Sequence, residues 1–219
     1  MLCIFDCDGV LVDSEHVAAR VFSLALAETG FTMSAEECLQ NFKGMTLAKC
    51  YAYIEERFAA PLPSHFPNLL RERSRQTFSE ELQAVAGVRE LLEFLSERGV
   101  EFCVASNGEP DKIAHSLDVC GITHYFPPQK QFSARDVGAG KPAPDLFLAA
   151  AESLGVPARF CWVIEDSVPG LCAAEKAEMN CIYFDAHDDR ENLHKNISVA
   201  QRCTTMDEVG SFFRSLLCN

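Results

Sequence analysis

The sequence lacks any apolar segment long enough to cross a membrane, and it lacks a basic leader. A membrane helix needs about 18 or more apolar residues in succession, and every apolar run here is interrupted well before that length. The first residues, MLCIFDCDGV, contain neither the positive charge nor the long apolar core of a secretion signal. These absences predict a cytoplasmic protein without a membrane partner.

Positive charge is also scarce. The 19 Lys and Arg side chains stand against 32 Asp and Glu, which gives a formal net charge of −13 at pH 7. An acidic surface repels the phosphate backbone of nucleic acids, so no nucleic-acid partner is expected.

The 11 cysteines include no Cys-x-x-Cys pair, and their number is odd. Three of them, Cys103, Cys161 and Cys181, lie inside apolar runs. We therefore expect reduced core residues.

What is present is a regular alternation of strand and helix patterns. With 48% hydrophobic and 23% charged residues, the chain has the composition of a globular protein. Short apolar runs predict buried strands, and amphipathic segments of 10 to 12 residues between them predict helices. The alternation favours an α/β fold with a doubly wound parallel sheet. The predicted strands are residues 2–5, 101–105, 160–164 and 181–184, and the predicted helices are residues 88–98, 111–120, 144–154, 168–179 and 206–217.

One long segment breaks this alternation. Between residues 14 and 84 only helical patterns occur, which is too much chain for a single crossover connection. We interpret it as an all-helical domain, residues 14–84, inserted into an α/β core of residues 1–13 and 85–219. Its predicted helices are residues 15–29, 34–41, 46–58 and 66–78.

Two carboxylates follow the first predicted strand, in the sequence Phe5-Asp6-Cys7-Asp8-Gly9. In extended chain, residues two apart point the same way, so Asp6 and Asp8 are predicted to face one site while Cys7 packs behind it. Ligands of open α/β sheets bind at the carboxyl ends of the strands. Because like charges this close are costly without a counter-ion, the pair suggests Mg²⁺.

Polar residues follow other predicted strands as well. Ser106 and Asn107 come after the second strand, Lys141 lies in a Gly-Lys-Pro segment, and Glu165-Asp166 follows the strand at 160–164. Each is ordinary alone, as a turn, a helix lead-in or an N-cap. Together they supply carboxylate oxygens for a metal, a hydroxyl and N–H donors for an oxyanion, and a cation for a transferring phosphoryl group.

In this combination the chain resembles the haloacid dehalogenase superfamily, in the branch with a helical domain inserted after the first strand. Its four motifs appear in order along the whole chain. The resemblance implies that Asp6 is a nucleophile attacking phosphorus, with Asp8 as acid and base. It implies Mg²⁺ held by the Asp6 carboxylate, the Asp8 backbone carbonyl and the Glu165 and Asp166 carboxylates. Ser106, the Asn107 N–H and Lys141 would bind the phosphoryl oxygens.

The same resemblance narrows the set of reactions that this protein is expected to catalyse. A dehalogenase needs no acid two residues after its nucleophile, and a phosphonatase uses a Schiff-base lysine in its helical domain. Lys43 matches the family's specificity loop better than that lysine, so Lys43 and Gly44 are predicted to bind substrate. The segments Asp8-Gly9-Val10 and Lys43-Gly44 both resemble β-phosphoglucomutase. That family has a histidine and an arginine where this chain has Ala18 and Leu47, so a second phosphate would lose its clamp.

The favoured function is therefore a monomeric, Mg²⁺-dependent phosphatase of a small phosphorylated sugar or sugar acid. The segments around Ser106-Asn107-Gly108 and His124-Tyr125 look like those of bacterial 6-phosphogluconate phosphatases. The alternatives are a sugar-phosphate mutase and a phospho-accepting switch. The switch is disfavoured because a receiver domain needs neither the inserted helices nor the second acid, Asp8.

Overall fold

The computed structural model describes residues 1–42, 45, 47–186 and 197–218. Its chain divides into two compact units, one of residues Met1–Val12 and Ala84–Asn219, the other of residues Asp13–Gln83. The boundaries expected from the sequence differ from these by one residue. Because the positions of the units relative to one another are not determined, each is described by itself.

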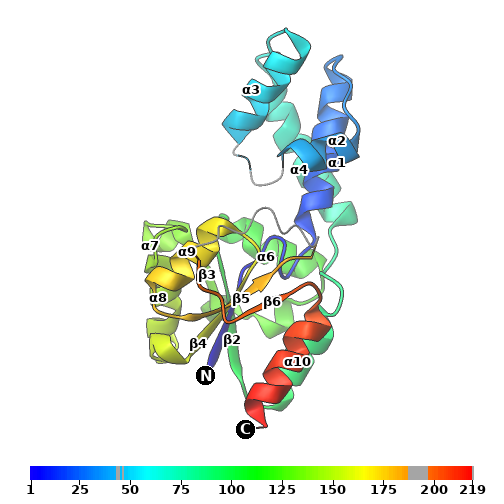
Figure 1. Cartoon of the computed structure of the whole chain (residues 1–219). Helices are drawn as coiled ribbons and strands as arrows, with labels where there is room; N and C mark the ends of the chain where they lie inside the picture. The colour runs from blue at the N-terminus through cyan, green and yellow to red at the C-terminus, as the bar shows by residue number, and fades with distance from the viewer. Residues whose placement is uncertain (43–44, 46, 187–196, 219) are drawn as a thin grey trace. The chain divides into compact units, whose positions relative to one another are not determined.

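A six-stranded parallel sheet forms the centre of the first unit, the core unit (Figure 1). The strand order is β3-β2-β1-β4-β5-β6, so the chain winds outward from β1 in both directions. This is the predicted doubly wound α/β architecture. The strands are β1 (Leu2–Phe5), β2 (Glu101–Ser106), β3 (Gln131–Ser133), β4 (Cys161–Glu165), β5 (Asn180–Phe184) and β6 (Gln201–Cys203).

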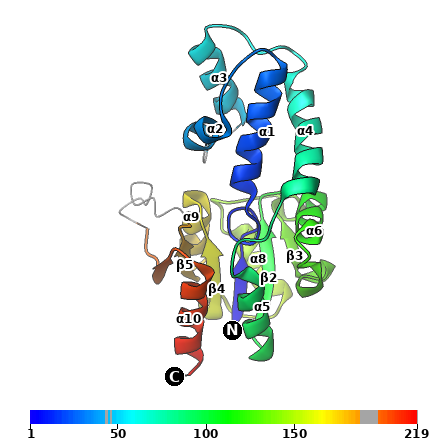
Figure 2. The same cartoon turned by 90° about the vertical axis from the view of Figure 1, so that its right-hand side faces the viewer.

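Helices cover both faces of the sheet. On one face, α8 and α9 pack their apolar side chains against β1, β2, β4 and β5 in a continuous core. On the opposite face, α5 and α10 pack against each other (Figure 2). The helices of this unit are α5 (Val88–Glu97), α6 (Pro110–Val119), α7 (Ala134–Val137), α8 (Asp145–Ser153), α9 (Val168–Lys176) and α10 (Met206–Leu217).

β1 is predicted from sequence because it is buried on both faces. All four of its residues are fully buried, and a strand between two helix layers needs apolar side chains at successive positions. β1 pairs with β2 from Leu2↔Glu101 to Phe5↔Val104 and with β4 from Leu2↔Cys161 to Phe5↔Ile164. This register brings the carboxyl ends of the three strands to one edge of the sheet.

The prediction of four strands was incomplete. β3 and β6 lie at the two edges of the sheet and have three residues each, with mixed polarity. Neither forms an apolar run, because an edge strand is only partly covered. The sequence analysis also missed the helix α7, because its 4 residues are too few to show a helical period.

The second unit, the helical unit, contains α1 (Ser14–Glu28), α2 (Ala35–Phe42), α3 (Leu47–Phe58) and α4 (Phe66–Glu81). A reciprocal capping box begins α2: the Ser34 Oγ accepts from the Glu37 N–H at 3.1 Å, and the Glu37 carboxylate accepts from the Ser34 N–H at 2.9 Å. The Arg73 guanidinium donates twice to Glu28, at 2.6 and 2.9 Å, and links α4 to α1. All four helices lie where the sequence places them.

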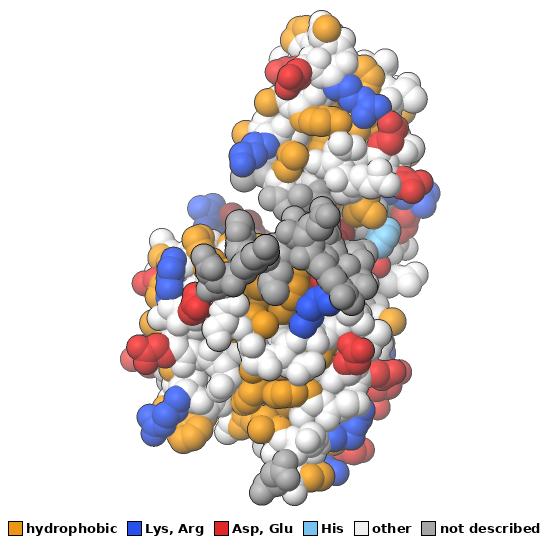
Figure 3. Space-filling view, in the orientation of Figure 1, with side chains coloured by type: hydrophobic (Ala, Val, Ile, Leu, Met, Phe, Trp, Pro, Cys, Tyr) orange, Lys and Arg blue, Asp and Glu red, His pale blue; other side chains and the backbone are white. Residues whose placement is uncertain are grey.

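The surface charges, the helix lengths and the cysteines can each be compared with the sequence. On the visible face of the core unit, acidic and basic side chains are interspersed (Figure 3). No helix in the described part of the chain is long and apolar enough to span a bilayer. Every cysteine is a free thiol, and only Cys172 and Cys218 are not buried.

Candidate active site

Asp6 follows β1 directly and lies at the carboxyl edge of the sheet. Its backbone N–H donates to the Ile164 carbonyl at 3.0 Å, which continues the pairing of β1 with β4 by one residue. The chain then turns, because the N–H groups of Leu11 and Val12 both donate to the Cys7 carbonyl at 3.0 Å. The Asp6 residue is only 8% exposed. The turn thus leaves a buried carboxylate at the end of the central strand.

Cys7 packs away from solvent, as the sequence predicts. It is 1% exposed, and burial, together with the neighbouring Asp8 and Asp6 carboxylates, raises the pKa of its thiol well above the ordinary value. A thiol that stays protonated is a poor nucleophile, so Cys7 has a structural role.

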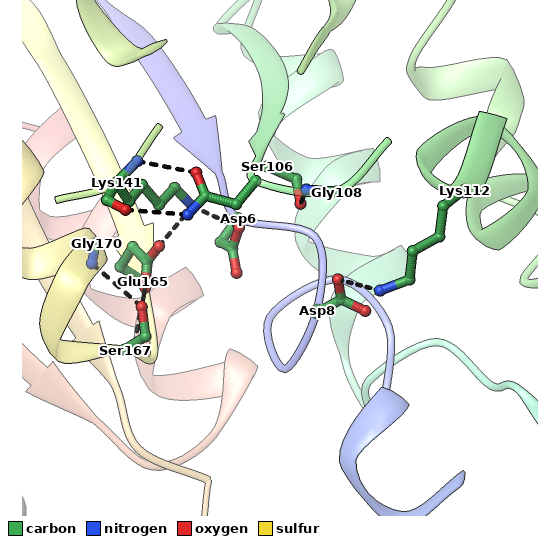
Figure 4. Close-up of polar contacts among 10 residues, drawn as sticks. Asp6, Asp8, Ser106, Gly108, Lys112, Lys141, Glu165, Ser167 and Gly170 are labelled. Atoms are coloured by element: carbon green, nitrogen blue, oxygen red, sulfur yellow. Dashed lines mark hydrogen bonds and ion pairs between the residues drawn. The ribbon is translucent and has the colours of Figure 1, made fainter. Parts of the chain in front are cut away.

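The ammonium group of Lys141 joins two buried carboxylates (Figure 4). Its Nζ lies 2.5 Å from Asp6 Oδ1 and 2.6 Å from Glu165 Oε1, and the three side chains are 4%, 11% and 0% exposed in that order. The same Nζ lies 5.1 Å from the centre of the Phe147 ring, a cation–π distance.

This burial perturbs the protonation of the group. Burial, with a contribution from the Glu165 charge, raises the pKa of Asp6 to about 7, against the lowering effect of Lys141. For Lys141, burial acts to lower the pKa, but the two carboxylates outweigh it and the pKa lies above the ordinary value. Perturbed groups clustered in this way are typical of functional sites.

Glu165 is held on both of its oxygens. While Oε1 accepts from Lys141, Oε2 accepts from the Ser167 N–H at 2.8 Å and from the Ser167 hydroxyl at 2.9 Å. Ser167 is also the N-cap of α9, its Oγ accepting from the Gly170 N–H. A Cβ on Gly170 would lie 1.9 Å from the Glu165 carboxyl carbon, so only glycine fits beside this side chain.

Three carboxylates come together as a possible metal site. Asp6, Glu165 and Asp166 each offer an oxygen, and these oxygens lie within 4.8 Å of one another. Hard carboxylate oxygens are the ligands of Mg²⁺ and Ca²⁺. Gly9, with φ of +80°, gives Asp166 its room, since a Cβ there would lie 2.1 Å from Asp166 Oδ2. The donor set and its glycine neighbours therefore fit a divalent cation.

Asn107 acts on the main chain of Lys141. Its amide N–H donates to the Lys141 carbonyl at 3.1 Å, and its amide oxygen accepts from the Lys141 N–H at 2.9 Å. Gly140 allows this approach, because a Cβ there would lie 2.4 Å from the Asn107 amide oxygen. The sequence had pointed to the Asn107 backbone N–H as a substrate donor and gave no sign of this side-chain clamp.

Ser106 ends β2 beside Asn107 and is 3% exposed. Its Oγ accepts from the Gly108 N–H at 3.0 Å, so the hydroxyl proton is directed elsewhere. Ser106 is thus a buried hydroxyl at the carboxyl edge of the sheet.

Asp8 lies in the turn and reaches a different cation. Its Oδ2 is 2.7 Å from the Nζ of Lys112, and its carboxylate points toward α6 (Figure 4). The prediction that Asp6 and Asp8 share one orientation assumed an extended chain, but β1 ends at Phe5. The turn, not the pleat, places Asp8 near Asp6, and the Asp8 charge contributes to the raised pKa of Asp6.

Sequence reasoning predicted a group of site residues, and the structure places those of the core unit at this edge of the sheet. They are Asp6, Asp8, Ser106, Asn107, Lys141, Glu165 and Asp166. Sequence reasoning missed Lys112, Ser167 and Gly170. The Ser at an N-cap position was a usable signal for Ser167, but nothing local marks Lys112. Lys43 and Gly44 lie outside the described residues.

The chain is similar in sequence and in structure to proteins named as phosphatases and hydrolases. The chain is 31% identical over 208 residues to 6-phosphogluconate phosphatase of Escherichia coli, covering 94% of this chain and 92% of that protein. It is 26% identical to hexitol phosphatase A of the same organism, covering 88% and 86%. A solved structure of a HAD family hydrolase from Deinococcus radiodurans, with bound phosphate and sodium, superposes with a TM-score of 0.85 at 29% identity and covers 99% of this chain and 96% of that one. The family model for haloacid dehalogenase-like hydrolases matches residues 3–184, and the chain belongs to that family.

Proposed function

We propose that the protein is a Mg²⁺-dependent phosphatase of a small phosphorylated metabolite, a sugar phosphate or sugar-acid phosphate. The observation that carries this proposal is the buried Asp6, which lies against the Lys141 ammonium with the Glu165 and Asp166 carboxylates beside it. Such a site offers a nucleophile, a cation and metal ligands within one small volume.

Asp6 is the nucleophile of this proposal. One of its carboxylate oxygens attacks phosphorus, the bond from phosphorus to the ester oxygen breaks, and that oxygen leaves with the electron pair and takes a proton from Asp8. The aspartyl-phosphate on Asp6 is then attacked by water, which gives its proton back to Asp8. Two easier steps replace one difficult hydrolysis.

The residues around Asp6 stabilise the charge that moves during transfer. The Lys141 ammonium, the Ser106 hydroxyl and the Asn107 backbone N–H would contact the oxygens of the phosphoryl group. Because negative charge is spread over the equatorial oxygens of the phosphoryl group during transfer, fixed donors of this kind account for much of the rate. The Asn107 side chain also holds the main chain of Lys141, so this one residue both donates to the phosphoryl group and fixes the lysine.

Magnesium would be held by the Asp6, Glu165 and Asp166 carboxylates and by the Asp8 backbone carbonyl. When bound, the ion offsets the repulsion between the Asp6 carboxylate and an anionic phosphate ester. Its fit is supported by the three convergent carboxylates and by the glycines beside them.

The substrate class is supported by the relatives. Proteins named for 6-phosphogluconate and hexitol phosphates match most of this chain. A protein of Thermotoga maritima named phosphorylated carbohydrates phosphatase is 28% identical and covers 84% of both chains. Lys43 and Gly44 remain our candidates for recognition of the leaving group.

The test is release of inorganic phosphate from sugar phosphates, sugar-acid phosphates and nucleotides, with Mg²⁺ or with EDTA. We expect release to need Mg²⁺ and to disappear in Asp6→Asn, a variant that keeps the shape of the side chain and removes its charge. Conversion of a hexose 1-phosphate into its 6-phosphate would instead establish the mutase. Stable phosphate on Asp6 without turnover would establish the switch.

A further inference from the structure

Lys112 makes the one contact of the Asp8 carboxylate seen among the described hydrogen bonds. It lies in the first turn of α6, and its Nζ is 2.7 Å from Asp8 Oδ2. Burial acts to lower the pKa of Lys112, but the charge of Asp8 and this hydrogen bond outweigh it, so the pKa lies above its ordinary value. The Lys112 side chain therefore stays positively charged beside the Asp8 carboxylate.

The two oxygens of the Asp8 carboxylate have different environments. While Oδ2 is bound by Lys112, Oδ1 is buried and has no hydrogen-bond partner among the described residues. A buried carboxylate oxygen without a donor is costly, by about 1–3 kcal/mol or more for a charged group.

From the contact between Lys112 and Asp8 we infer that Lys112 is a positioning residue, which holds the Asp8 carboxyl group in place to serve the leaving group. The inference rests on the proposed phosphatase function. In the proposed reaction, the proton of the Asp8 carboxyl group passes to the ester oxygen as its bond to phosphorus breaks, and the phosphoryl group goes to Asp6. General acids need correct placement of the donor atom, and a displacement of about 1 Å can cost about 100-fold in rate.

The place of Lys112 in the chain supports this role. It lies in the first turn of α6, directly after the loop that contains Asn107 and connects β2 to α6. The start of that loop is fixed, because the Gly108 N–H donates to the Ser106 Oγ at 3.0 Å and the Gly108 carbonyl accepts from the Ser133 hydroxyl at 2.7 Å. An anchored loop thus connects the end of β2, where the predicted phosphate-binding residues Ser106 and Asn107 lie, to the helix turn that contains Lys112.

The ion pair contributes little to folding. The Lys112 and Asp8 side chains are 47% and 32% exposed, and ion pairs at such exposure stabilise a protein by about 0–1 kcal/mol. Removal of the Lys112 charge should therefore change catalysis without unfolding the protein, which makes the role testable.

The experiment compares Lys112→Met, Lys112→Gln and Lys112→Arg with wild type in Mg²⁺, on two esters. One is the best sugar phosphate found for the wild type, whose alkoxide must be protonated as it leaves. The other is 4-nitrophenyl phosphate, whose phenolate leaves without a proton. The value of kcat/KM is measured because it reports the steps up to departure of the leaving group, not the later hydrolysis of the phosphoenzyme.

We expect Lys112→Met and Lys112→Gln to lose about 10- to 100-fold in kcat/KM on the sugar phosphate and less than about threefold on 4-nitrophenyl phosphate. Lys112→Arg should recover most of the loss, because a guanidinium also donates to Oδ2. Lys130→Met is the matched control. The Lys130 Nζ lies 2.8 Å from Glu101 Oε2, and neither residue belongs to the site. This variant should therefore match wild type on both esters.

Any of four results would overturn the inference. Equal losses on both esters would assign a general structural role, and so would failure of both neutral variants to fold. Unchanged kinetics would show that Asp8 needs no partner. A loss confined to a sugar-acid phosphate, with a neutral sugar phosphate unaffected, would make Lys112 a substrate-binding cation instead. Failure of the proposed function itself is separate, because wild type would then release phosphate from neither ester.

Discussion

Removal of the Lys141 ammonium should destabilise the metal-free protein strongly. Lys141 is 4% exposed and lies within 2.6 Å of two carboxylates, Asp6 and Glu165, which are 11% and 0% exposed. Loss of one partner from a buried ionic group leaves charges without compensation and costs about 3–5 kcal/mol. We therefore expect Lys141→Met to lower the free energy of unfolding by about that amount in EDTA.

The assay is urea unfolding followed by tryptophan fluorescence. The chain has a single tryptophan, Trp162 in β4, so the signal reports the core unit that contains the site. Addition of Mg²⁺ should return part of the lost stability, because a cation bound by the same carboxylates replaces some of the missing charge. Lys130→Met should cost at most about 1 kcal/mol, since its pair is 24% and 58% exposed.

The same variant has a predicted pH dependence. The pKa of Asp6 is about 7 in the wild type, raised mainly by burial and lowered by Lys141, and it should lie higher without the lysine. An acid whose pKa is raised on folding binds its proton more tightly in the folded state, so stability falls as pH rises toward the folded pKa. The deficit of Lys141→Met relative to wild type should therefore be larger at pH 8.5 than at pH 6.

Two outcomes would refute this reasoning. One is a free energy of unfolding for Lys141→Met within about 1 kcal/mol of wild type in EDTA, the cost of an ordinary surface pair. The other is a double variant, Lys141→Met with Glu165→Gln, that is no more stable than Lys141→Met alone. Removal of one of the two uncompensated charges should instead recover part of the loss.

Three further predictions concern the surroundings of the site. Gly170→Ala should destabilise the protein by about 1–3 kcal/mol and lower phosphatase activity, because its Cβ would meet Glu165; helix propensity alone predicts stabilisation by about 1 kcal/mol, so urea unfolding decides between them. Asn107→Ala should cost about 1–3 kcal/mol and at least tenfold in kcat, through loss of two hydrogen bonds to the Lys141 main chain; wild-type kcat would contradict this. In native protein, iodoacetamide should modify the exposed Cys218 first, as checked by peptide mass spectrometry; earlier labelling of a buried cysteine would argue against the packing described.

The parts of the fold that could be predicted are those with a strong local pattern. β1 is apolar at four successive positions because it is covered on both faces, and α10 begins and ends where its periodicity does. β3 and β6 could not be found, since three residues at a sheet edge leave no periodic signal. A short strand is defined by its partner in space, which the sequence does not show.

The site divides in a similar way. Asp6, Lys141 and Glu165 were identified because strand ends of a parallel sheet meet at one edge. Lys112 was not, because its partner Asp8 lies 104 residues away and the contact depends on how α6 begins. Residue types at strand ends were thus predictable, whereas the pairing of particular atoms was not.

The position of β1 has a consequence for the order in which the chain is made. β1 lies between β2 and β4, yet its pairing residues at 101–104 and 161–164 leave the ribosome much later. Meanwhile the helical unit, residues Asp13–Gln83, is complete and can fold by local contacts. The apolar segment LCIF must therefore remain unpaired until β2 emerges, and it can pair on both sides only after β4 emerges. During synthesis the apolar side chains of this segment are therefore exposed, and Asp6 can meet its partners Lys141 and Glu165 only after residues 141 and 165 have emerged.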